Sequence, residues 1–101
     1  MNVIGKYIIS EGRLFYSRNE SLKSLEELDL SPKVIIDLLT QGYVVTLDII
    51  GLYLVTIWPS GDIEAWCGEG QLWKEKQNID QYLNKIFTEY QGKIRFERLE
   101  K

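Results

Sequence analysis

The chain has 101 residues, of which 45% are hydrophobic and 27% charged, and its net charge at pH 7 is −3. This length suits a single domain spanning residues 1–101, and this composition excludes a disordered chain. The sequence contains no histidine, which excludes Ser-His-Asp and Cys-His nucleophile systems and most zinc sites. A single cysteine, Cys67, allows no intramolecular disulfide.

The N-terminal third predicts a hairpin followed by a short helix. Residues 3–9 and 13–17 are rich in β-branched and aromatic side chains and are joined through Glu11-Gly12, which favours two paired strands. Leucine then recurs at every third position within residues 21–30, and this spacing predicts a short helix there.

The first main helix is predicted over about residues 32–41. Ser31 can cap its start, Pro32 suits the first helical position and Gly42 suits the end. Apolar residues fall on one side of this segment, so the helix should pack against a sheet.

Residues 43–75 predict an antiparallel meander of three or four strands, since they are rich in β-branched and aromatic residues. The strands are expected at residues 43–49, 52–58, 63–67 and, as a fourth, 71–75. Gly51 is either the turn of a hairpin or a bulge in one long strand. The apolar run over residues 50–58 would promote aggregation at a sheet edge, so we expect it in a central strand.

The second main helix is predicted over about residues 79–91, with Asn78 as its cap and Gly92 at its end. A last strand follows over residues 93–99. Runs of strands interrupted by helices are typical of an α+β fold, here an antiparallel sheet with two main helices packed on one face.

The chain also predicts its location. Its first residues show no signal-peptide pattern, and the longest uncharged stretch, residues 49–61, is too short to span a bilayer. We therefore expect a cytoplasmic protein.

Charge is distributed unevenly, and this distribution predicts a partner. No Lys or Arg lies between Lys33 and Lys74, whereas several acids do. If Ile63, Ala65 and Cys67 point inward from a strand, Glu64 and Trp66 point outward together. An exposed tryptophan among acids favours a basic protein partner. The predicted docking residues are Asp48, Asp62, Glu64, Trp66 and Glu69. Small inhibitors, including immunity and antitoxin proteins, are often acidic and free of catalytic motifs, so we expect a non-enzymatic binding protein of this kind.

Several alternatives stay open. The basic C-terminal segment, with Lys93, Arg95, Phe96 and Arg98, could bind nucleic acid, although the overall acidity argues against it. A homo-oligomeric structural subunit would explain the aromatic content. The tryptophans could instead fill the core, and Cys67 is expected to be an inert apolar residue beside the sheet. A metal or acid–base site on the carboxylates Asp62, Glu64 and Glu69 is a further alternative. No catalytic residue, cofactor or metal is predicted.

Overall fold

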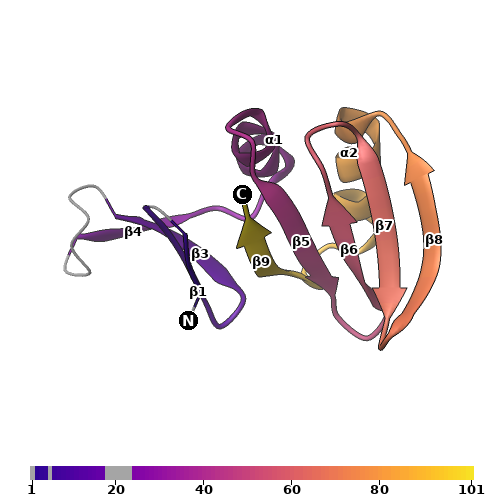
Figure 1. Cartoon of the computed structure of the whole chain (residues 1–101). Helices are drawn as coiled ribbons and strands as arrows, with labels where there is room; N and C mark the ends of the chain where they lie inside the picture. The colour runs from indigo at the N-terminus through magenta and orange to yellow at the C-terminus, as the bar shows by residue number, and fades with distance from the viewer. Residues whose placement is uncertain (1, 5, 18–23) are drawn as a thin grey trace.

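The computed structural model describes residues 2–4, 6–17 and 24–101, which form an α+β fold of two antiparallel sheets and two helices (Figure 1). The elements in chain order are β1 (Asn2–Ile4), β2 (Tyr7–Ser10), β3 (Arg13–Ser17), β4 (Leu25–Leu28), α1 (Pro32–Thr40), β5 (Val44–Ile49), β6 (Tyr53–Ile57), β7 (Asp62–Cys67), β8 (Gly70–Lys76), α2 (Ile79–Glu89) and β9 (Ile94–Glu100). The predicted fold class is confirmed.

The larger sheet has five strands in the order β8-β7-β6-β5-β9, and the smaller has four in the order β1-β2-β3-β4. The predicted meander is thus present with its fourth strand, and β9 returns to pair with β5. Strand β6 is central, as its apolar sequence requires. Gly51, with a positive φ of 82°, lies in the hairpin turn between β5 and β6, which settles its role.

Two predictions for the N-terminal third are corrected. Residues 3–9 do not form one strand, because β1 and β2 are separate strands that pair with each other. The helix predicted within residues 21–30 is wrong for its described part, where β4 pairs with β3 and places Leu28 opposite Leu14. This pairing overrides a local leucine spacing that is only weak evidence for a helix. Residues 18–23 lie outside the described residues.

Both main helices form where their caps predict. The Ser31 hydroxyl accepts a hydrogen bond from the Val34 N–H at 3.3 Å, and the Asn78 side chain accepts one from the Gln81 N–H at 3.0 Å. The helices end at Thr40 and Glu89, slightly earlier than predicted. Neither described helix is long and apolar enough to cross a membrane.

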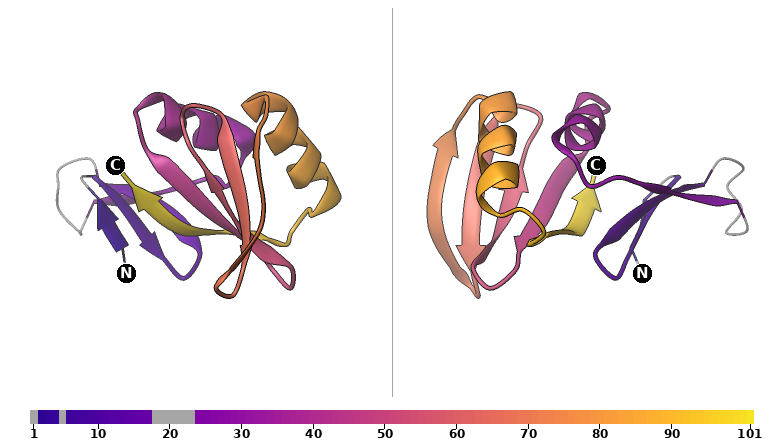
Figure 2. Two further views of the ribbon diagram at one scale, coloured as in Figure 1. Left: turned by 45° about the vertical axis from the view of Figure 1, so that its right-hand side comes forward. Right: turned by 180° about the vertical axis from the view of Figure 1, so that it is seen from behind.

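The main core lies between the five-stranded sheet and the two helices. Both helices pack on the same face of this sheet (Figure 2). The fully buried side chains of this layer come from alternate strand positions and from the apolar faces of the helices. They include Val45, Leu47, Ile49, Val55, Ile57, Ile63, Ile35, Leu38 and Leu83.

The four-stranded sheet joins the larger sheet beside β9 (Figure 1). At the tip of the β2–β3 hairpin, the Gly12 carbonyl accepts a hydrogen bond from the Phe96 N–H at 3.0 Å. Gly12 has a φ of 77°, and a Cβ there would lie 2.8 Å from Cδ of Arg95. The junction therefore requires glycine for both conformation and space.

Candidate functional site

The other face of the five-stranded sheet carries no helix within the described part of the chain. We call it the open face. The residues that project from it occupy alternate strand positions matched across the ladder. They are Val44, Thr46, Asp48, Leu54, Thr56, Trp58, Asp62, Glu64, Trp66, Lys74, Lys76, Arg95, Arg98 and Glu100.

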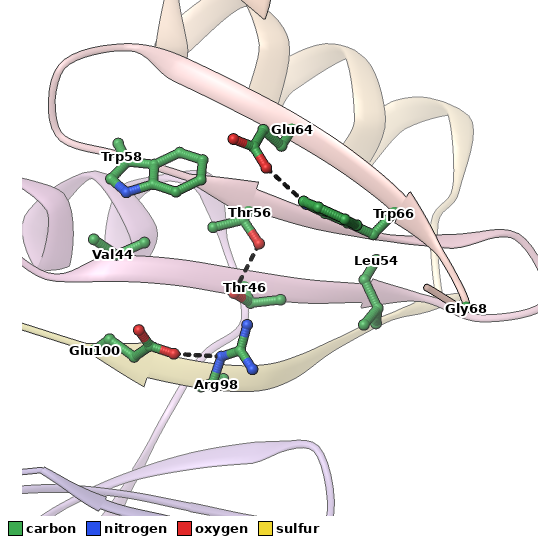
Figure 3. Close-up of a pocket in the computed structure, with 10 residues that line it drawn as sticks. All are labelled: Val44, Thr46, Leu54, Thr56, Trp58, Glu64, Trp66, Gly68, Arg98 and Glu100. Atoms are coloured by element: carbon green, nitrogen blue, oxygen red, sulfur yellow. Dashed lines mark hydrogen bonds and ion pairs between the residues drawn. The ribbon is translucent and has the colours of Figure 1, made fainter. Parts of the chain in front are cut away.

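A hollow of about 380 Å³ lies near the centre of the open face (Figure 3). Its floor is formed by Thr46 and Thr56, whose hydroxyl oxygens are 3.1 Å apart. Trp58 stands at one end and Trp66 at the other (Figure 3). The hollow thus combines a small polar floor with two large aromatic walls, the composition typical of a recognition site.

Glu64 is the most enclosed charged group of the open face, since the residue is only 9% exposed. Its carboxylate lies between the rings of Trp58 and Trp66 (Figure 3). Oε2 accepts a hydrogen bond from Nε1 of Trp66 at 2.8 Å, and Oε1 lies 3.3 Å from Nζ of Lys74. The same ammonium group is 5.9 Å from the ring centroid of Trp58. The carboxylate is therefore held in one orientation by a charge-assisted hydrogen bond.

The sheet places cations beside acids of the stretch that contains no Lys or Arg. Arg95 Nη2 lies 2.7 Å from Asp48 Oδ2, as Lys74 lies beside Glu64. Another pair lies within β9, where Arg98 Nε is 2.7 Å from Glu100 Oε1. These arginines come from β9, and Lys74 comes from β8, so the cations stand on the two outer strands. Glu64, in contrast, projects from inner strand β7. The open face is acidic near its centre and basic along its borders.

Four of the five predicted docking residues share the open face. Asp48 lies at its β9 side, and Glu64 and Trp66 flank the hollow. Asp62 lies at the start of β7, where its carboxylate accepts a hydrogen bond from the Ser60 hydroxyl at 2.7 Å. Glu69 is exposed in the turn between β7 and β8.

The predicted orientation of β7 is correct at two positions and wrong at a third. Ile63 and Ala65 are fully buried on the helix side. Cys67, expected to point inward with them, is exposed. Cys67 is the last residue of β7, and the buried core does not extend to it.

The three tryptophans divide between the two faces of the sheet. Trp58 and Trp66 line the hollow. Trp73 lies on the helix side, where its ring centroid is 6.4 Å from that of Tyr53 and 6.1 Å from that of Tyr82. The sequence left open whether the tryptophans fill the core, and of the three only Trp73 packs against it.

The alternative set for nucleic acid requires one correction. Lys93, Arg95 and Arg98 are exposed, but Phe96 is only 2% exposed and belongs to the core. A ring in this position offers no surface on which a base could stack. Of the residues predicted to bind nucleic acid, only the cations Lys93, Arg95 and Arg98 are therefore accessible.

The residues missing from the prediction are those that complete the hollow. Trp58 forms one wall, and the floor is the Thr46–Thr56 pair. The signal for all three was present, because they alternate with the buried residues of β5 and β6. Among the described residues, no group of three or more acidic or cysteine side chains is placed to hold a metal ion.

Comparison of the chain with protein-family models, curated proteins and solved structures finds no match.

Proposed function

We propose that this chain is a non-enzymatic binding protein that docks a protein partner on its open face, through a basic group at the centre of the partner's surface. The observation that carries the proposal is the enclosed carboxylate of Glu64 between Trp58 and Trp66, on a sheet face that neither described helix covers. Binding energy in protein interfaces concentrates on such central aromatic residues, especially tryptophan.

The charges of the face support a partner with a cation at the centre of its own surface. Glu64 attracts such a cation, while Lys74, Arg95 and Arg98 on the outer strands favour acidic residues around it. The existing pairs of these cations do not block such a partner, because exposed ion pairs contribute little and exchange readily.

The test is affinity capture from the cells that make the protein, with a matched pair of variants. The face variant is Trp66→Ala with Glu64→Gln. The control is Leu25→Ala with Glu89→Gln, which also removes one apolar side chain and one carboxylate but lies off the open face, since Leu25 belongs to β4 of the smaller sheet and Glu89 to α2. We expect a protein that the wild type and the control retain and the face variant loses.

The captured protein is then purified and its affinity measured by calorimetry. We expect the face variant to bind at least about thirtyfold more weakly, the loss typical of a hot-spot residue. Equal affinity for the wild type and the face variant would refute the proposed site. The inhibitor type, the cytoplasmic location and the homo-oligomer alternative stay predictions, the last to be tested by light scattering.

A further inference from the structure

We propose that the group recognised at the centre of the open face is an arginine side chain of the partner, with its guanidinium in the hollow beside Glu64. This inference rests on the proposed function and specifies its ligand. It follows from three observations, which are the indoles at the two ends of the hollow, the free capacity of its carboxylate, and the contact that Lys74, a cation of the chain itself, already makes with that carboxylate.

The two indoles lie at opposite ends of the hollow. Glu64 and Thr56 face each other across β6 and β7, while Trp58 and Trp66 each lie two residues further along their strands, in opposite directions. Two residues of a strand span about 7 Å, so the two tryptophans are offset from each other by about 14 Å along the strands. A planar group above the threonine floor therefore lies between the two indoles and can stack on one of them.

The carboxylate retains hydrogen-bonding capacity toward the hollow. An ionised carboxylate offers about four acceptor positions. Trp66 uses one on Oε2, and Lys74 approaches Oε1 from the β8 side. The hollow opens on the other side, over β5 and β6, so a second donor can reach Glu64 without removing the first.

Lys74 shows that these groups bind a cation. Its ammonium contacts both the Glu64 carboxylate, at 3.3 Å, and the face of Trp58, at 5.9 Å. Its side chain is 57% exposed on an edge strand, so it competes only weakly for this position. Arginine suits the hollow better than lysine, because a guanidinium both stacks on an indole and donates in parallel to a carboxylate.

The test is a titration of the ¹⁵N-labelled protein with N-acetyl-arginine amide, followed through the Nε1–H resonance of Trp66. N-acetyl-citrulline amide is the matched probe, because it has the same shape without the charge. We expect a saturable shift with arginine at about 1–10 mM and at least about tenfold weaker binding of citrulline. Glu64→Gln should weaken arginine binding at least about tenfold, and Lys74→Met should tighten it about threefold.

Two results would overturn the inference: no shift of open-face resonances at about 50 mM arginine amide, or equal binding of the citrulline probe. Both are measured on the wild-type protein, so they do not depend on the folding of a variant. If arginine amide does not bind while the face variant still loses a captured partner, arginine recognition is refuted and the open face remains the docking site. If arginine binds while the face variant keeps every captured partner, the docking function fails instead.

Discussion

The threonine pair under the hollow allows a stability measurement that tests the described geometry directly. Thr46 and Thr56 are 2% and 7% exposed, and their hydroxyls are hydrogen-bonded to each other at 3.1 Å. The experiment replaces each by valine, singly and together, since valine keeps the branched shape and removes only the hydroxyl.

The expected free energies follow from the enclosure of the pair. In either single variant the remaining hydroxyl stays buried without its partner, which costs about 1–2 kcal/mol of the free energy of unfolding. The double variant removes both hydroxyls, so no polar group is stranded, and its free energy of unfolding should lie within about 0.5 kcal/mol of the wild type. The single changes should therefore be non-additive by at least about 1 kcal/mol.

Urea unfolding monitored by tryptophan fluorescence measures these differences, provided that all four proteins share one m-value. If the double variant lost the sum of the two single losses, the hydroxyls would not be each other's main partners. The description of the hollow floor would then be wrong.

Three further predictions concern the core and the junction of the two sheets. The Tyr82 hydroxyl is buried with no hydrogen-bond partner among the described residues, so Tyr82→Phe should raise the free energy of unfolding by about 1 kcal/mol in urea. Burial also raises the pKa of Tyr82, so ionisation of this hydroxyl favours the unfolded state and lowers the free energy of unfolding as the pH rises above about 10. The Tyr82→Phe variant lacks this ionisation, so its thermal unfolding between pH 8 and 11 should show a smaller decline at alkaline pH. Phe96→Ala should cost about 3–5 kcal/mol by urea unfolding, as for a core residue, and a loss below about 1 kcal/mol would contradict its burial. Gly12→Ala should lower the free energy of unfolding by at least about 1 kcal/mol, because the residue has a positive φ and a Cβ would meet Arg95; an unchanged melting curve would contradict this packing.

The parts of the fold that could be predicted are those that local sequence determines. The helix starts depend on single side chains, Ser31 and Asn78, that bond to backbone groups a few residues away. The meander depends on β-branched runs separated by glycine turns such as Gly51. Such signals act within one turn or hairpin, so they are readable without the rest of the chain.

The N-terminal third could be predicted only for the β2–β3 hairpin, which turns at Glu11-Gly12, because the rest depends on non-local contacts. Whether Leu25–Leu28 becomes a helix or a strand is decided by its pairing with β3. The division of the strands into two sheets depends on the pairing of β9 with β5 at the edge of the larger sheet, which the local sequence does not indicate. The contact of Gly12 with β9 likewise has no signature in the local pattern.

The residues predicted for the candidate site lie mainly on β7, with Asp48 on β5, and the prediction missed the other residues of the hollow. Alternation along β7 predicts that Glu64 and Trp66 project together. The cations beside the acids, Lys74 on β8 and Arg95 on β9, follow only from the register of the sheet. A lysine- and arginine-free stretch of sequence therefore does not imply an acidic surface.

The row across the middle of the open face supports the proposed docking function. In order across the sheet it consists of Lys74, Glu64, Thr56, Thr46 and Arg98. Stability alone does not require an enclosed carboxylate there, because removing a charged group from water costs free energy that an apolar side chain would not cost. A purely solvated face, conversely, would not place two tryptophans beside that carboxylate. Enclosed charge, aromatic walls and a free face together favour a ligand that carries the opposite charge.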